Sequence, residues 1–147
     1  MSVTAMSINW YNKGKKHMLQ SVDTSSTTFK MLLTTSSYTP DAAAHDFLDD
    51  ITNECSGSGY SRATLGSVTT TEVSAGLWML DSADPQFSAS GGNIVARYWV
   101  LFQDTGVAAT SGLICYGLLD NTNSNVTIVD ATTLDVLVPS TGWIRWS

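Results

Sequence analysis

The clearest hydrophobic pattern in the chain is a ten-residue run from Ile94 to Gln103, in which apolar side chains occupy both alternating faces. Successive side chains of a strand point to opposite faces, so a run that is apolar on both predicts a central strand covered on two sides. Asp104-Thr105-Gly106 ends this run. We expect residues 113–119 to return as its antiparallel hairpin partner.

Shorter runs of apolar, Thr and Val residues recur along the chain, separated by Gly, Pro, Asp, Asn and Ser, as is typical of strands and turns. These runs are 29–33, 60–65, 67–74, 76–80, 126–129, 134–138 and 143–146. The run at 76–80 is apolar on both faces, so we expect a covered strand there. Short strands at regular spacing predict a mainly β protein, an antiparallel β-sandwich or a barrel-like domain.

One stretch carries a helical pattern instead. Thr39 is placed as an N-cap, Pro40 as the first helical residue and Asp41 as a negative charge in the first turn. The apolar residues that follow at i, i+3, i+4 and i+7 are Ala44, Phe47, Leu48 and Ile51. Gly57-Ser58-Gly59 ends the pattern, which predicts one short α-helix over about 40–54.

Residues 1–27 show no clear periodicity, and we assign residues 28–147 to a single β-rich domain. Two interpretations of the N-terminal residues remain open. They form either an extended arm that docks Trp10 on a neighbouring surface or a first strand followed by a loose loop. A chain of 147 residues is long enough to bury a core as one domain.

Composition narrows the functional classes. Charged residues make up 14 % of the chain and the formal net charge is −6, whereas nucleic-acid-binding domains carry basic patches. The one basic cluster, residues 13–17, is interpreted as a solvated end, so we expect no nucleic-acid partner. No apolar run approaches the roughly 18 residues of a membrane span, so we expect no membrane partner. With no secretory-signal pattern, we expect production in the cytoplasm and, for Cys55 and Cys115, buried free thiols.

Candidate chemistry is sparse. His45 lies among acidic residues, but the sequence has no G-x-S-x-G elbow, so a structural histidine is the favoured interpretation. The acids at 41–54 lack the spacing and central Gly of a calcium loop, which favours a solvated acidic face. Gly57-Ser58-Gly59 is followed by no phosphate-binding Lys. We therefore predict a protein that is not an enzyme, with no catalytic residues, no metal site and no cofactor.

The order of several blocks resembles a known family. The blocks are Tyr38-Thr39-Pro40, His45–Ile51, Gly59–Arg62, Ala96–Phe102, Asp104-Thr105-Gly106, Ala109-Thr110-Ser111 and Leu113–Tyr116, followed by a terminal aromatic strand. In this order the chain is similar to small virion proteins of tailed bacteriophages, those described as head decoration or cement proteins. The chain departs from that pattern in its long segment at 120–125 and its extra apolar run at 134–138. The resemblance implies a structural, non-enzymatic role and supplies no catalytic residues.

The resemblance leads to the prediction of a capsid decoration (cement) protein on the outer surface of the virion. Its expected partners are the major capsid protein and further copies of itself, as a homotrimer. The residues expected at these interfaces are Trp10, Tyr11, Trp143, Trp146, Asp46, Asp49 and Asp50. Two alternatives stay open, a tail, neck or head-fibre protein of the same virion and a carbohydrate-binding β-sandwich module that uses its Trp residues.

Overall fold

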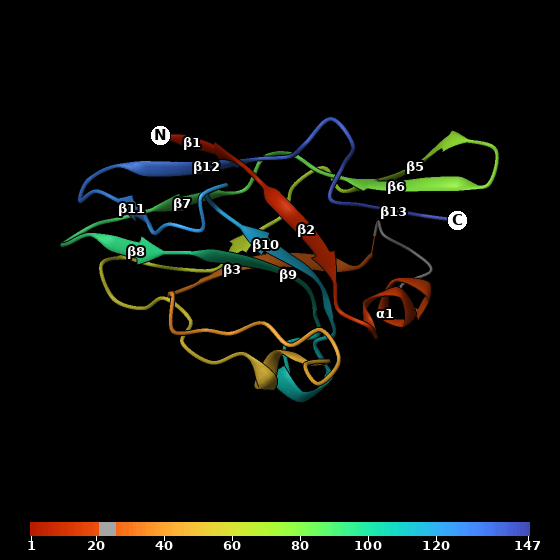
Figure 1. Ribbon diagram of the computed structural model, residues 1–147, viewed down its shortest axis with the longest axis horizontal. Coiled ribbons are helices and arrows are strands. Elements are labelled where there is room, and N and C mark those ends of the chain that lie inside the picture. Colours follow the sequence, from red (N-terminus) through yellow and green to blue (C-terminus); the bar gives the residue numbers. More distant parts are fainter. Residues whose placement is uncertain (21–25) are drawn as a thin grey trace.

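The computed structural model describes residues 1–20 and 26–147, and it is mainly β, with antiparallel sheets and one short α-helix (Figure 1). The helix α1 spans Gly14–Gln20. The strands are β1 Ser2–Thr4, β2 Met6–Trp10, β3 Thr28–Thr34, β4 Ala63–Thr64, β5 Thr69–Ser74, β6 Leu77–Asp81, β7 Gln86–Ser88, β8 Ile94–Ala96, β9 Tyr98–Asp104, β10 Leu113–Leu118, β11 Val126–Ile128, β12 Thr133–Leu137 and β13 Ile144–Trp146. The fold also contains two 3₁₀ turns, η1 Leu48–Asp50 and η2 Ala108–Thr110. The predicted β-sandwich class is confirmed.

A five-stranded antiparallel sheet in the order β2-β10-β9-β3-β4 forms the centre of the molecule. The predicted hairpin pairing of residues 113–119 with the long apolar run is confirmed, because β10 pairs antiparallel with β9. Along β9, Trp99 and Leu101 face one side, whereas Val100 and Phe102 face the other, and all four are fully buried. The central strand is therefore covered on both faces, as its sequence predicts.

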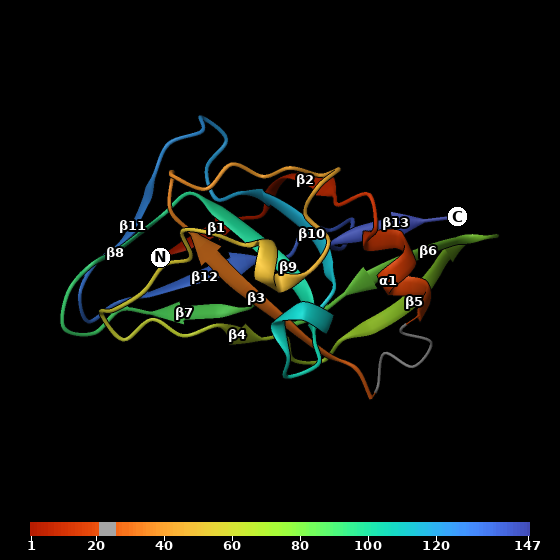
Figure 2. The same cartoon turned by 90° about the horizontal axis from the view of Figure 1, so that it is seen from below.

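Each face of the central sheet is covered by a different layer. On one face the larger core packs against three smaller sheets, β1-β12-β7, β11-β8 and β13-β6-β5, where Trp99 meets Trp143 at a ring-centroid distance of 5.2 Å. On the other face a smaller core lies beneath the loop that carries η1 (Figures 1 and 2). The sheets stay separate rather than closing on themselves, so the barrel-like alternative is set aside in favour of the sandwich.

The predicted α-helix at about 40–54 is wrong in its position. Residues 42–44 form a turn and only the 3₁₀ turn η1 follows, while the short helix of the fold lies at α1. The backbone of this stretch bonds to neighbouring strands instead of to itself. Leu48 N–H donates to Ser111 O at 2.9 Å, and Cys55 N–H donates to Leu33 O at 2.9 Å. Such non-local bonds satisfy backbone groups that a helix would have paired internally.

The N-terminal residues are part of the sheets and not an extended arm. β1 pairs in parallel with β12, and β2 forms the edge of the central sheet beside β10. Met1 also donates from its amino group to Thr133 O at 3.1 Å. The interpretation of residues 1–27 as a first strand is the one that fits β1 and β2, although residues 21–25 lie outside the described part of the chain.

The run from Ile94 to Gln103 is divided in two. β8 pairs with β11, and β9 pairs with β3 and β10, so the strand changes sheets at Arg97. Arg97 keeps contact with the central sheet, since its N–H donates to Thr34 O and its C=O accepts from Leu119 N–H. A sandwich forms its corners where strands pass from one sheet to the next in this way.

Candidate functional site

Two of the predicted interface residues, Trp10 and Trp146, do come together at the surface. They line a hollow of about 100 Å³ with Lys15, Met18 and Leu19. Trp146 lies directly opposite Trp78 in the pairing of β13 with β6. We call Trp10, Leu19, Trp78 and Trp146 the aromatic end, and Figures 1 and 2 show α1, β6 and β13 gathered at this end of the molecule.

The aromatic end is exposed because its strands extend past the core. On β6, Leu80 is fully buried, whereas Trp78, two residues earlier on the same face, is 41 % exposed. The expectation that residues 76–80 are covered is therefore wrong at Trp78. Leu19 on α1 is 71 % exposed, and the Lys15 ammonium lies 5.9 Å from the centre of the Trp10 ring. Exposed large apolar side chains gathered at one place are typical of interaction surfaces.

The other two aromatic residues predicted at an interface lie inside the domain. Trp143 is 1 % exposed, packs on Trp99 and donates from Nε1 to Ser82 Oγ at 2.9 Å. Tyr11 is fully buried in the smaller core. Their prediction as partner contacts is corrected, because both residues serve the sandwich interior, where large aromatic side chains bury the most apolar surface.

The three acidic candidates divide by role. Asp46 pairs with Lys13, and Asp50 Oδ2 accepts the backbone N–H groups of Asp46 and Phe47 at 2.8 and 3.1 Å. These hydrogen bonds lower the pKa of the Asp50 carboxyl, since they favour its charged form. Asp49 is the exposed member. Asp46 and Asp50 thus organise the loop itself, and only Asp49 presents a carboxylate outward.

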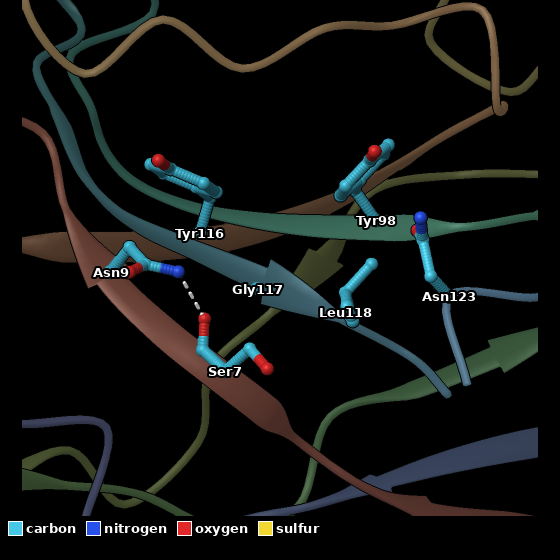
Figure 3. A pocket seen from close by; sticks show the side chains of 7 residues that line it. All are labelled: Ser7, Asn9, Tyr98, Tyr116, Gly117, Leu118 and Asn123. Atoms are coloured by element: carbon cyan, nitrogen blue, oxygen red, sulfur yellow. Dashed lines mark hydrogen bonds between the residues drawn. The ribbon is translucent and has the colours of Figure 1, made fainter. Parts of the chain in front are cut away.

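A second hollow, of about 290 Å³, lies on the face of the central sheet near β2. Its lining residues are Ser7, Asn9, Tyr98, Tyr116, Gly117, Leu118 and Asn123. Figure 3 shows the two phenol rings rising from the same face of the sheet, with Asn9 on the neighbouring strand and Asn123 beyond Leu118. We call this hollow the tyrosine groove. Its residues come from three adjacent strands and the loop after β10, so the sheet register sets their spacing.

A buried hydrogen-bonded chain lies beside the groove. Tyr11 and Tyr38 share a hydrogen bond of 2.8 Å between their hydroxyls, and Tyr38 Oη lies 2.9 Å from His45 Nδ1. Asp41 N–H donates to the same Nδ1 at 3.3 Å, so Tyr38 donates to His45 and Tyr11 donates to Tyr38. Burial raises the pKa of Tyr38 to about 12 and that of Tyr11 further. Both phenols keep their protons at neutral pH, which suits a structural chain and not proton transfer.

The β10 backbone bends at the groove. The pairing of β10 with β2 shifts register between Tyr116 and Leu118, and Ser7 opposite has a φ of 50°. Gly117 is required there, because an added Cβ would lie 2.3 Å from Met6 O and 2.6 Å from the Trp99 ring. Asn123, at the far side of the groove, has a φ of 58°. β-bulges and left-handed residues often shape binding surfaces by re-aiming side chains.

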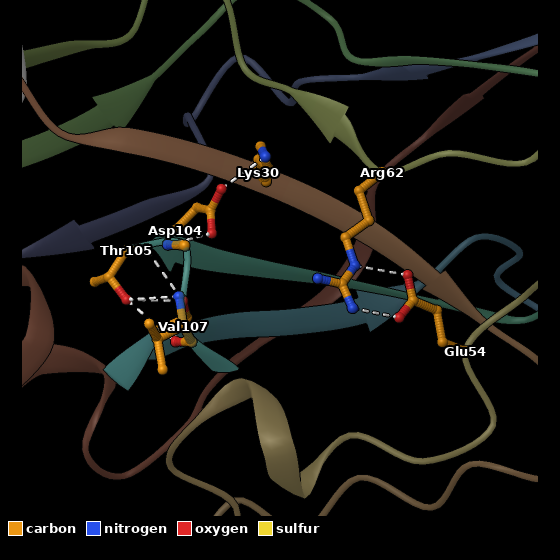
Figure 4. Close-up of polar contacts among 8 residues, drawn as sticks. Lys30, Glu54, Arg62, Asp104, Thr105 and Val107 are labelled. Atoms are coloured by element: carbon orange, nitrogen blue, oxygen red, sulfur yellow. Dashed lines mark hydrogen bonds and ion pairs between the residues drawn. The ribbon is translucent and has the colours of Figure 1, made fainter. Parts of the chain in front are cut away.

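Several basic side chains of the surface form ion pairs with carboxylates. Arg62 makes a two-pronged pair with Glu54, at 2.8 and 2.7 Å, and Lys30 pairs with Asp104 at 2.6 Å (Figure 4). The lysine pair lowers the pKa of Asp104 through its hydrogen bond. In the basic run at 13–17, Lys13 pairs with Asp46 and His17 is buried, while Lys15 and Lys16 are exposed.

Within the described residues, no group of three or more His, Cys, Asp or Glu side chains is placed to hold a metal ion. Cys55 and Cys115 are buried free thiols, and burial raises the pKa of the Cys55 thiol to about 11. In the same part of the chain, no helix has both the length and the apolar character to span a bilayer.

Comparison of the chain with protein-family models, with curated proteins and with solved structures finds no match in any of the three.

Three residues of the two surface sites, Trp78, Tyr98 and Tyr116, were not predicted as functional from the sequence. Trp78 stands in an apolar run, so nothing in its local pattern separates it from a core residue. Tyr98 lies in the run predicted to be covered and Tyr116 lies in its predicted hairpin partner, and each is half-buried at the margin of the smaller core. The tyrosine hydroxyl is the one sequence signal that could have indicated their exposure, because this group favours a position in partial contact with water.

Proposed function

We propose that this protein is a bacteriophage capsid decoration (cement) protein that binds the outer surface of the major capsid protein shell. The observation that carries the proposal is the aromatic end, where Trp78 and Leu19 remain 41 % and 71 % exposed in the isolated chain. Aromatic residues are enriched at protein interfaces and charged ones are depleted at interface centres. The low charge content of the chain and its resemblance to small virion proteins give further support.

The proposed mechanism is physical. Each subunit buries the aromatic end against the shell or a neighbouring copy, and a homotrimer places three such contacts across a joint between capsomers. Once one subunit of a trimer is bound, the other two subunits are held at a high effective concentration near their own binding sites. The avidity of the trimer therefore exceeds the affinity of a single subunit by a large factor. Many modest interfaces together then resist the outward pressure of packaged DNA.

Co-sedimentation with capsid shells tests the proposal. Shells of the virus that encodes the chain are stripped of this protein and mixed with purified wild type or with Trp78→Ser. We expect the wild type to sediment with the shells as a trimer and Trp78→Ser to bind at least tenfold more weakly, because a hot-spot Trp contributes about 2 kcal/mol or more.

Val95→Ser is the matched control. Val95 is 44 % exposed on β8, away from the aromatic end, so its replacement removes an exposed apolar side chain without touching the proposed interface. Equal losses in both variants, or no wild-type binding to shells, would overturn the proposal. Immunogold labelling of whole particles adds the location, and gold on the tail or neck would replace the decoration role with the tail or neck alternative.

A further inference from the structure

The tyrosine groove has a lining without charge. Its seven residues comprise two phenols, two carboxamides, a hydroxyl, a glycine and a leucine. An anionic ligand would find no cation in this lining, and phosphate or nucleic-acid sites depend on such cations or on clustered backbone amides. The lining therefore selects a neutral ligand that has both apolar faces and hydrogen-bonding groups.

The polar groups of the groove are available. Within the described chain, the hydroxyls of Tyr98 and Tyr116 and the side-chain amide of Asn123 have no protein hydrogen-bond partner. The Asn9 amide donates to Ser7 O and keeps its carbonyl oxygen as an acceptor. Four side chains thus offer both donors and acceptors around one hollow.

The two phenol rings are held in place from below. Tyr116 packs on buried Tyr11 with ring centroids 4.8 Å apart, and Tyr98 meets buried Tyr38 edge-on at 6.1 Å. Tyr11 and Tyr38 are in turn joined by their hydrogen bond. A ligand would meet rings that are already ordered, which lowers the entropy lost on binding.

We propose that the tyrosine groove binds a neutral saccharide. A pyranose ring has apolar C–H faces that stack on aromatic rings and equatorial hydroxyls that bond to amide and phenol groups. Tyr98 and Tyr116 supply the rings, which stand side by side on one sheet face in Figure 3, and Asn9 and Asn123 supply the amides. Ligand sites of this size combine aromatic walls with a few placed polar groups. The site is separate from the aromatic end and does not depend on capsid binding.

Titration followed by NMR tests the groove directly. ¹⁵N-labelled full-length protein is titrated with the neutral trisaccharides maltotriose, cellotriose and chitotriose, and with sulfated lactose as a charged probe. We expect saturable shifts of the Asn9 and Asn123 side-chain amides and the Gly117 amide with at least one neutral sugar. The expected dissociation constant is on the order of 1 mM or lower, the weak end of specific binding.

The variants Tyr116→Phe and Asn123→Gly remove one hydroxyl and one amide while keeping the ring and the left-handed backbone. We expect their combination to weaken sugar binding about tenfold or more, since it removes two of the groups that hydrogen-bond the sugar. Asn53→Gly is the matched control, because Asn53 also has a positive φ, of 55°, and lies outside the groove lining.

Any of three results with the neutral sugars would overturn the proposal. They are no shift with any of the neutral sugars, shifts confined to residues outside the groove, and binding that Tyr116→Phe with Asn123→Gly leaves unchanged. Binding of the sulfated sugar alone would also reject a neutral ligand. None of these results bears on the co-sedimentation test, so the two proposals fail independently.

Discussion

At the scale of single residues, Tyr38 joins several side chains in and around the smaller core. Its hydroxyl accepts from Tyr11 and donates to His45, while its ring lies under Tyr98. Tyr38 is 1 % exposed and Tyr11 is fully buried, so neither of these two hydroxyls can bond to water instead. A buried polar group without a partner destabilises the folded state more than a made hydrogen bond stabilises it.

We expect Tyr38→Phe to lower the free energy of unfolding by about 1–3 kcal/mol, because it leaves the Tyr11 hydroxyl without its partner. Urea unfolding followed by Trp fluorescence measures the change. Tyr116→Phe is the control, since the Tyr116 hydroxyl has no protein partner in the described chain, and its effect should stay within about 0.5 kcal/mol. Equal effects of the two substitutions would show that the buried chain adds nothing.

At the scale of elements, the loop from residue 35 to residue 55 replaces the helix that its sequence predicts. The residues that predict the start of a helix form a turn instead. Asp41 Oδ1 accepts hydrogen bonds from the backbone N–H groups of Ala43 and Ala44, at 2.9 and 3.0 Å, and these bonds close the turn. Phe47 then bridges to Gly112, and the chain continues across the smaller core. The same capping chemistry that begins a helix here forms a turn, because the following backbone pairs with β10.

Asp50 anchors the second half of this loop, and we expect Asp50→Ala to destabilise the protein by about 1 kcal/mol at pH 7, the usual effect of losing a capping side chain. The pKa of Asp50 is lowered in the folded state. Its contribution is therefore complete above the unfolded pKa of 3.8 and is lost as the pH falls through the lower folded pKa.

Denaturant unfolding of wild type and Asp50→Ala at pH 7, 5, 4 and 3 measures this dependence. The difference between the two should be constant from pH 7 to 5 and shrink below pH 4. Asp49→Ala is the control, because the neighbouring carboxylate is exposed. A difference that does not change with pH would mean that Asp50 acts by packing and not through its charge.

At the scale of the whole molecule, the central sheet is covered by buried side chains on both of its faces. Cys115 lies on β10, next to β9, and is fully buried in the larger core. Burial raises the pKa of its thiol well above the ordinary value. Thiolate is the reactive form of cysteine, so this residue combines low access with low reactivity.

We expect Cys115 in a Cys55→Ser background to react with a thiol reagent only as fast as the protein unfolds. Labelling at pH 8 in increasing urea should follow the unfolding rate measured by Trp fluorescence, since both report the opening of the central sheet. Fast labelling in native buffer would contradict the burial of β10 between β2 and β9 in the central sheet.

The sequence by itself determined the class of fold and most of the strands, whereas β1, β2 and β7 lie outside the predicted runs. The period-two pattern of β12 follows from the pleat of the chain, and a strand that is apolar on both faces, such as β9, must be covered twice. Both patterns depend only on which side chains of a strand are buried. They can therefore be recognised in the sequence without knowing which strand pairs with which. The run at 134–138 was found in this way, and it matches β12 closely.

Apart from the β9–β10 hairpin, only the tertiary structure decided which strands pair, and it alone decided which aromatic side chains reach the surface. Tyr11 and Trp143 became core residues, whereas Trp78 became exposed, although all three are aromatic residues in apolar or mixed surroundings. The cause is non-local: no other element of the described chain covers Trp78 near the start of β6, whereas Trp99 packs against Trp143. The hydrophobic pattern of the sequence indicates which side chains favour burial. The three-dimensional path of the chain determines whether another element lies close enough to bury them.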